Sequence, residues 1–141
     1  MCLIVARILQ KMGYTGRCSF DLVLCGKKIE DAHLKFVECN GRWGGGSLPM
    51  TLMNRLFEDH RLQPYIHRKI QSKWLIRVRF SKFIEVFDDV LYSAKTNQGW
   101  AIVTNLALMT VNGHVDLITL GENVEQAEQR QDEFLNLISV P

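Results

Sequence analysis

Residues 13–49 read GYTGRCSFDLVLCGKKIEDAHLKFVECNGRWGGGSLP, and this stretch carries the clearest structural signals in the chain. After the GYTG turn signal, residues 18–25 (CSFDLVLC) have the composition of a strand. Residues 34–40 (LKFVECN) are a second predicted strand, and the polar segment of residues 26–31 separates the two. Two strands joined by a short polar loop are most simply an antiparallel hairpin.

Helices are predicted on both sides of this hairpin. Residues 1–12 place apolar side chains at helical spacing, and Gly13 follows where a helix C-cap belongs. Beyond the glycine-rich loop of residues 41–46, Ser47 is suited to be the N-cap of a helix over residues 48–59.

The second half of the chain mixes further strands and helices. The pattern predicts strands over residues 74–80, 100–111 and 114–120, and helices over residues 81–92 and 124–138. Asn112-Gly113 is the strongest two-residue hairpin signal in the chain, so we expect the last two strands to be joined there. Antiparallel strands mixed with helices predict the α+β class, an antiparallel sheet with flanking helices.

Length and composition exclude several classes of protein. The chain has 141 residues, of which 47% are hydrophobic, and 17 basic against 15 acidic residues give a net charge of +2. This composition excludes a disordered tail, a collagen-like repeat and a disulfide-dense miniprotein. The four cysteines form no C-x-x-C pair, which favours small apolar side chains over a zinc site.

Partners and location follow from the same counts. Residues 60–79 are locally basic, but the near-neutral total favours a solvated basic face over a nucleic-acid surface, so we expect no nucleic-acid partner. The longest apolar run, residues 1–6, is interrupted by Arg7, and it is too short for a membrane span or the core of a signal peptide. We therefore expect a cytoplasmic protein without a membrane partner.

Three oxygen-bearing side chains gather in the predicted hairpin. Glu38 and Asn40 are two residues apart, so both leave the same face of their strand. If Asp21 pairs with Glu38, the two lie roughly 5 Å apart at Cβ and Asn40 is diagonal to Asp21. A register shifted by two residues sets Asp21 against Asn40 and keeps all three on one face. Such oxygens suit Mg²⁺ or Mn²⁺, although spacing alone favours the polar face of an exposed hairpin.

The residues that follow favour a ligand that bears phosphate. Arg42 lies two positions beyond Asn40, where its guanidinium can reach anionic oxygens held by the same cation. Gly44, Gly45 and Gly46 then lead into the helix that starts at Ser47, and backbone N–H groups at a helix N-terminus favour an anion.

These motifs together resemble the last catalytic segment of the ATP-grasp superfamily. In that family a G-x-x-G-x-x-x-x-D strand is followed by a strand that ends in E-x-N, often continued as E-x-N-x-R, as in GYTGRCSFD and ECNGR here. The resemblance implies that Asp21, Glu38 and Asn40 bind the magnesium ions of ATP. It also implies that Arg42 is a catalytic residue that contacts phosphate or an acyl phosphate.

The resemblance carries expectations about the whole protein. It implies an ATP-dependent carboxylate–amine ligase of the peptide type, in which residues 1–60 are the C-terminal part of the catalytic domain and residues 61–141 a following α+β region packed on it. The lobe that holds adenine lies upstream of this segment in the family, so we expect a fragment or subunit that binds ATP weakly or not at all when alone. The alternative is a non-catalytic α+β interaction domain. Apolar surface that would face a missing lobe predicts self-association, for example as a homodimer.

Overall fold

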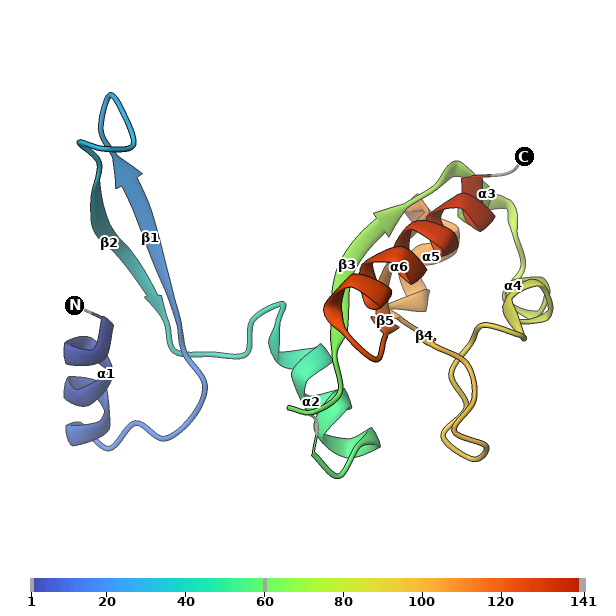
Figure 1. Ribbon diagram of the computed structural model, residues 1–141, viewed down its shortest axis with the longest axis horizontal. Coiled ribbons are helices and arrows are strands. Elements are labelled where there is room, and N and C mark those ends of the chain that lie inside the picture. Colours follow the sequence, from blue (N-terminus) through green and yellow to red (C-terminus); the bar gives the residue numbers. More distant parts are fainter. Residues whose placement is uncertain (1, 60, 140–141) are drawn as a thin grey trace. The chain divides into compact units, whose positions relative to one another are not determined.

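A computed structural model describes residues 2–59 and 61–139 (Figure 1). Met1 of the first predicted helix and His60 of the basic segment lie outside the described residues. The chain forms two compact units, Met1–Thr51 and Leu52–Pro141. Antiparallel sheets and flanking helices make up the fold, so the predicted α+β class is confirmed. The functional division at residue 60 stays a prediction.

The first unit is built around the predicted hairpin. Its elements are α1 (Cys2–Lys11), β1 (Ser19–Cys25), β2 (His33–Asn40) and the first half of α2 (Ser47–Leu56). β1 and β2 pair antiparallel, as the sequence predicts. Gly13 ends α1 with a positive φ of 87°, which supports its predicted role at the helix C-terminus.

The hairpin changes register halfway along. Asp21 pairs with Glu38, which confirms the first of the two predicted registers, but Leu22 then pairs with Phe36 instead of Val37. Val37 is therefore the extra residue of a β-bulge. If the register that pairs Asp21 with Glu38 continued unbroken, as the sequence predicts, Val23 would lie opposite Phe36 and Cys25 opposite Leu34. This part of the prediction is wrong, because the bulge places Val23 opposite Lys35 and Cys25 opposite His33.

The bulge separates the two faces of the hairpin by polarity. Since successive residues of a strand alternate, one face carries apolar side chains and the other carries polar ones together with Val23. The apolar face holds Phe20, Leu22, Leu24, Leu34, Phe36 and Cys39. The rings of Phe20 and Phe36 lie 5.9 Å apart between centres, a contact that the unbulged register would not allow.

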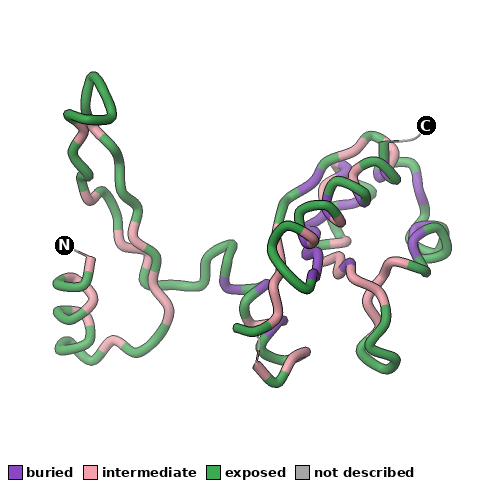
Figure 2. The backbone as a smooth tube through the Cα atoms, viewed as in Figure 1, coloured by how far each residue is buried: buried purple, intermediate pink, exposed green. Residues whose placement is uncertain are grey.

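Buried residues are concentrated in the second unit (Figure 2). Among the described residues, the buried hydrophobic side chains that make up the core all belong to Leu52–Pro141. The first unit is mostly exposed, so its order depends on strand pairing and on local hydrogen bonds.

The second unit is a three-stranded antiparallel sheet with helices. Its strand order is β3-β5-β4, with β5 in the centre. The elements in chain order are β3 (Tyr65–Gln71), α3 (Lys73–Arg77), α4 (Phe80–Phe87), β4 (Ala101–Thr104), the 3₁₀ helix η1 (Leu106–Leu108), α5 (Met109–Asn112), β5 (His114–Leu120) and α6 (Val124–Ser139). None of the described helices has the length and apolar character needed to cross a membrane.

Aromatic rings fill the centre of the second unit. Phe87 stacks on Phe134 of α6 with ring centres 4.7 Å apart, and Phe83 lies 4.8 Å from Phe87. The buried Thr119 hydroxyl of β5 donates to the carbonyl of Ala127 at 2.8 Å, which holds α6 against the central strand. Asn123 caps α6 by accepting from the N–H of Gln126 at 2.8 Å.

The predicted strand over residues 74–80 is wrong. Residues 73–77 form α3, and the Ser72 hydroxyl accepts from the N–H of Trp74 at 3.2 Å as its N-cap. Leu75 and Val78, three positions apart, are the buried side chains, so helical spacing and not alternation determines burial here. The strand lies earlier, in the basic segment, where β3 pairs with β5.

The predicted hairpin at Asn112-Gly113 is also wrong. The strand expected over residues 100–111 ends at Thr104, and η1 and α5 occupy the rest. Gly113 follows α5 with a φ of 71°, and a Cβ there would lie 2.3 Å from the carbonyl oxygen of Ser72. Gly113 would also suit a hairpin turn, but here it ends α5 and packs against the main chain of Ser72.

Replacing Phe87 tests the aromatic core. We expect Phe87→Ala to lower the free energy of unfolding by about 3–5 kcal/mol, because this side chain is 1% exposed and its loss leaves a cavity. The matched control is Phe80→Ala in the same helix, where the ring is 52% exposed and the expected loss is below about 1 kcal/mol. Urea unfolding followed by tryptophan fluorescence in a Trp43→Phe background measures both. Equal losses would contradict the core described here.

Candidate functional site

Arg17, just before β1, connects the start of the hairpin to the first turns of α2 by hydrogen bonds. Its Nη1 donates to the carbonyl oxygen of Ser47 at 3.0 Å and to Oγ1 of Thr51 at 3.2 Å. The Tyr14 hydroxyl donates to the carbonyl oxygen of Arg17 at 2.6 Å, which closes the turn before β1. These bonds hold the glycine-rich segment beside the first residues of β1.

A cavity of about 460 Å³ lies between these segments. Its lining comes from the turn before β1, from the segment after β2 and from the first turn of α2. The lining residues are Gly16, Arg17, Cys18, Ser19, Arg42, Gly44, Gly45, Gly46, Ser47 and Met50. The structure therefore brings together all five residues that the sequence predicts to contact phosphate, and it adds a second arginine.

The lining offers positive charge and unpaired donors. Arg42 makes no hydrogen bond or ion pair with the other described residues, and Arg17 uses only Nη1. Within the described segments, the backbone N–H groups of Gly45 and Gly46 also have no acceptor. Such an arrangement can bind an anion through guanidinium and main-chain donors together.

Ser47 has a different local role from the predicted one. Helix α2 begins at Ser47 itself and ends at Leu56, so the predicted helix over residues 48–59 is displaced toward the N-terminus. The Ser47 hydroxyl accepts from the N–H of Gly44 at 3.0 Å, and the Ser47 N–H donates back to the Gly44 carbonyl at 2.9 Å. The Ser47 side chain therefore stabilises the turn formed by the glycine-rich segment.

Asp21, Glu38 and Asn40 share the polar face of the hairpin. Asp21 lies directly opposite Glu38, and Nδ2 of Asn40 donates to Oδ2 of Asp21 at 3.3 Å. Both carboxylates are exposed. In this arrangement the amide nitrogen of Asn40 faces Asp21, so a cation bound there requires the amide to turn its oxygen inward. No group of three or more His, Cys, Asp and Glu that could hold a metal occurs in residues 2–59 and 61–139.

Ser19 joins this polar face to the cavity. It is the strand partner of Asn40, it leaves the same face as Asp21, and it also lines the cavity. Asp21, Glu38 and Asn40 themselves do not line the cavity, so Ser19 is the residue that the polar face and the lining share.

Comparison of the chain with protein-family models, with curated proteins and with solved structures finds no match.

The sequence did not predict that Arg17, Cys18 and Ser19 belong to this site, nor the bulge at Val37. Arg17 directly follows the GYTG turn, and a positive charge at that position was the one sequence feature that could have indicated its role. Cys18 and Ser19 gave no chemical motif, and only the fold of the turn places them in the lining. The bulge at Val37 had no signal in the residues themselves.

Cys39 of β2 interacts with Cys18, which lines the cavity. Burial raises the pKa of the Cys39 thiol above the ordinary 9.0, and the adjacent Cys18 raises it further through charge and a hydrogen bond between the side chains. Both cysteines are free and partly buried. A raised pKa keeps the thiol protonated and slows its reaction with electrophiles at neutral pH.

Alkylation of Cys39 tests this neighbourhood. We expect the pH midpoint of its reaction with iodoacetamide, followed by peptide mass spectrometry, to lie above 9.0 and to fall in Cys18→Ala, because the variant removes two of the causes that raise the pKa. Cys25→Ala is the control, since Cys25 pairs with His33 at the far end of the hairpin. A midpoint that is not raised in the unchanged protein, or that is the same in Cys18→Ala, would show the assignment to be wrong.

Proposed function

We propose that this chain supplies the magnesium- and phosphate-binding segment of an ATP-grasp-type ligase that joins a carboxylate to an amine. The single observation that carries the proposal is the cavity lined by Arg42, Gly44, Gly45, Gly46 and Ser47, whose lining also includes Ser19, two positions before Asp21 on the same face of β1. The motif resemblance named these residues from their order in the chain. Because these five residues are close in the chain, the separate geometric support is the turn before β1, which lines the same cavity and contributes Arg17.

The glycines support a ligand at this place. Gly44, Gly45 and Gly46 have no positive φ, and a Cβ built on any of them meets nothing within 4 Å. The fold of the described residues therefore does not require glycine at these three positions, although glycine costs conformational entropy. A close approach of phosphate oxygens to the main chain is a physical reason for their absence of side chains.

The charges support a magnesium-bound triphosphate. The Asp21 and Glu38 carboxylates and the Asn40 amide are oxygen donors of the kind that Mg²⁺ or Mn²⁺ prefers. When bound, the cation would neutralise charge on the phosphate oxygens. Arg42 extends from the same end of β2, unpaired, and would hold anionic oxygens and stabilise negative charge on a transferring phosphoryl group.

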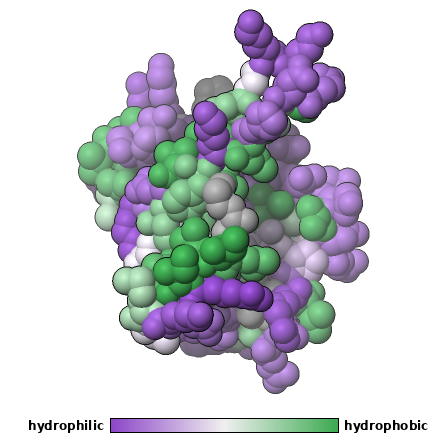
Figure 3. Space-filling model, turned by 90° about the vertical axis from the view of Figure 1, so that its left-hand side faces the viewer, coloured by the Kyte–Doolittle hydropathy of each residue, from purple (hydrophilic) through white to green (hydrophobic). Residues whose placement is uncertain are grey.

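A non-catalytic interaction domain is the second candidate. The observation in its favour is an exposed apolar stripe, formed by Ile4 and Ile8 of α1 and by Met12 just after the helix. Figure 3 shows a face of the molecule on which apolar side chains reach the solvent. A second copy of the chain, paired through this stripe across a two-fold axis, would cover it.

Binding of manganese and inorganic triphosphate tests the ligase proposal without an adenine site. We expect the double variant Asp21→Asn, Glu38→Gln to weaken Mn²⁺ binding, and Arg42→Met to weaken Mn²⁺–triphosphate binding, each by at least about tenfold. Calorimetry and the electron paramagnetic resonance of free Mn²⁺ measure these constants.

Matched controls separate the site from general charge effects. Glu30→Gln, Asp31→Asn makes the same charge change in the turn that joins the same two strands, and Arg55→Met removes an exposed arginine from α2. Both should leave the constants unchanged. Equal losses in the controls and in the site variants, or no binding to the unchanged protein, would refute the proposal.

Sedimentation tests the second candidate. We expect dimers at about 100 μM if the interface has a micromolar dissociation constant, and monomers in Ile4→Glu, Ile8→Glu because charge opposes burial of the stripe. Gln10→Glu, on the opposite side of α1, should leave the association unchanged. A monomer at all concentrations would exclude this interface.

A further inference from the structure

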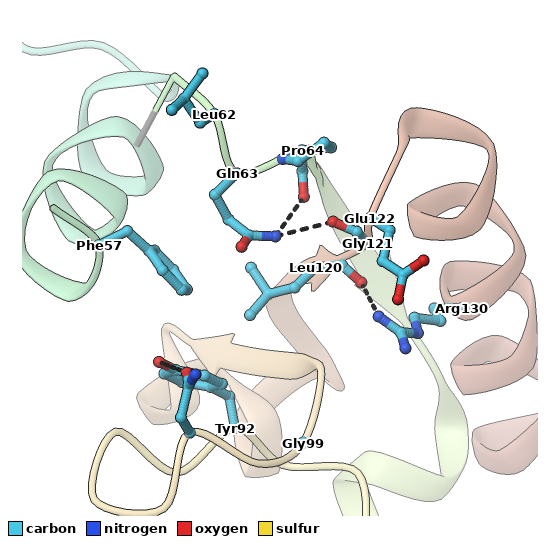
Figure 4. Close-up of a pocket in the computed structure, with 11 residues that line it drawn as sticks. Phe57, Leu62, Gln63, Pro64, Tyr92, Gly99, Leu120, Gly121, Glu122 and Arg130 are labelled. Atoms are coloured by element: carbon cyan, nitrogen blue, oxygen red, sulfur yellow. Dashed lines mark hydrogen bonds between the residues drawn. The ribbon is translucent and has the colours of Figure 1, made fainter. Parts of the chain in front are cut away.

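The second unit contains a separate cavity of about 390 Å³ (Figure 4). Its walls come from the segment after α2, the turn after β5, the loop before β4 and one residue of α6. Among the lining residues are Phe57, Gln63, Tyr92, Leu120, Glu122 and Arg130. All of them belong to Leu52–Pro141, so this cavity is a feature of that unit alone.

Two opposite charges line the cavity without pairing. Glu122 and Arg130 lie on the same side of the close-up, yet no ion pair within 4.0 Å joins them in the described structure. The Glu122 carboxylate makes no side-chain hydrogen bond with the described residues. Unpaired charges of both signs in one cavity can each be met by a ligand that carries both charges.

The Arg130 guanidinium is held in place while part of it remains available. Nη1 donates to the carbonyl oxygen of Leu120 at 2.8 Å, and the guanidinium carbon lies 5.9 Å from the centre of the Trp100 ring. These contacts leave Nε and Nη2 without an acceptor among the described residues. A carboxylate approaching this edge would find a preoriented pair of donors.

The opposite side of the cavity is aromatic. The rings of Phe57 and Tyr92 lie 5.6 Å apart between centres, and Figure 4 shows them across from Glu122 and Arg130, with Leu120 between the two sides. The Tyr92 hydroxyl donates to Oδ1 of Asn97 at 2.9 Å, so its polar end is satisfied. Gln63 closes the rim by donating to the carbonyl oxygens of Pro64 and Gly121, at 3.2 Å and 2.9 Å.

We propose that this cavity binds a free α-amino acid with an apolar or aromatic side chain. The ammonium group faces the Glu122 carboxylate, the carboxylate faces Arg130, and the side chain lies against Phe57 and Tyr92. The volume lies in the range of small-molecule sites. The inference does not rest on the proposed ligase function, since none of its residues belongs to the first unit.

Calorimetric titration of the full chain with L-phenylalanine tests the proposal. We expect saturable binding with a dissociation constant of about 1 mM or tighter. Three analogues each remove one recognised group: 3-phenylpropionate lacks the ammonium, phenethylamine lacks the carboxylate and glycine lacks the side chain. Each should bind at least about tenfold more weakly. No binding of L-phenylalanine, or equal binding of 3-phenylpropionate, would overturn the proposal.

Variants assign the two charges. Glu122→Gln should weaken L-phenylalanine at least about tenfold and leave 3-phenylpropionate unchanged, because only the amino acid carries the ammonium group. Glu125→Gln is its matched control, because Glu125 in the first turn of α6 is exposed like Glu122 but does not line the cavity. Arg130→Lys keeps the charge but not the paired donors, and should weaken L-phenylalanine but not phenethylamine. Unchanged affinity for L-phenylalanine in Glu122→Gln would refute the assignment, whatever the result with triphosphate.

Discussion

The alternation of side chains along a β-strand is the constraint on which both units depend. In the hairpin, this alternation alone would place Phe36 on the same face as Glu38, because the two residues are separated by one position. The bulge at Val37 resets it, so that Phe36 joins Phe20 on the apolar face while Glu38 stays opposite Asp21. One extra residue therefore allows carboxylates to gather on one side and rings on the other.

In the second unit, the same alternation directs the side chains of the central strand β5 into the core on both faces of the sheet. Val115, Leu117 and Thr119 of β5 lie on the face that α6 covers, and Ile118 and Leu120 lie on the other, where Met53 packs. Because β5 is central and buried on both sides, helices and flanking strands all find apolar partners there. The first unit has no comparable core among its described residues. Its segments are held in place instead by hydrogen bonds such as that from Arg17 to the carbonyl oxygen of Ser47.

Each of the two cavities contains an arginine that is anchored by the main chain. In each, an arginine is held by a main-chain carbonyl oxygen, Arg17 by that of Ser47 and Arg130 by that of Leu120, and its remaining donors stay open. An anchored guanidinium loses less freedom when it binds an anion than a free surface arginine would. The partners differ: glycine N–H groups in the first cavity favour a phosphate, whereas aromatic rings and a carboxylate in the second favour a small zwitterion.

The sequence alone predicted the hairpin, α1, β5 and α6, and it placed Asp21, Glu38 and Asn40 on one face of the hairpin. These predictions were possible because turn residues, apolar periodicity and the alternation of strand residues act over a few neighbouring positions. The same local patterns misplaced residues 74–80, where alternating side chains also fit a helix that buries Leu75, and indicated a hairpin at Asn112-Gly113 although Gly113 ends a helix. Only tertiary structure decided the bulge, the place of Arg17 and the second cavity. These depend on which distant segments meet, and pairing energies between residues far apart in the chain leave no local pattern.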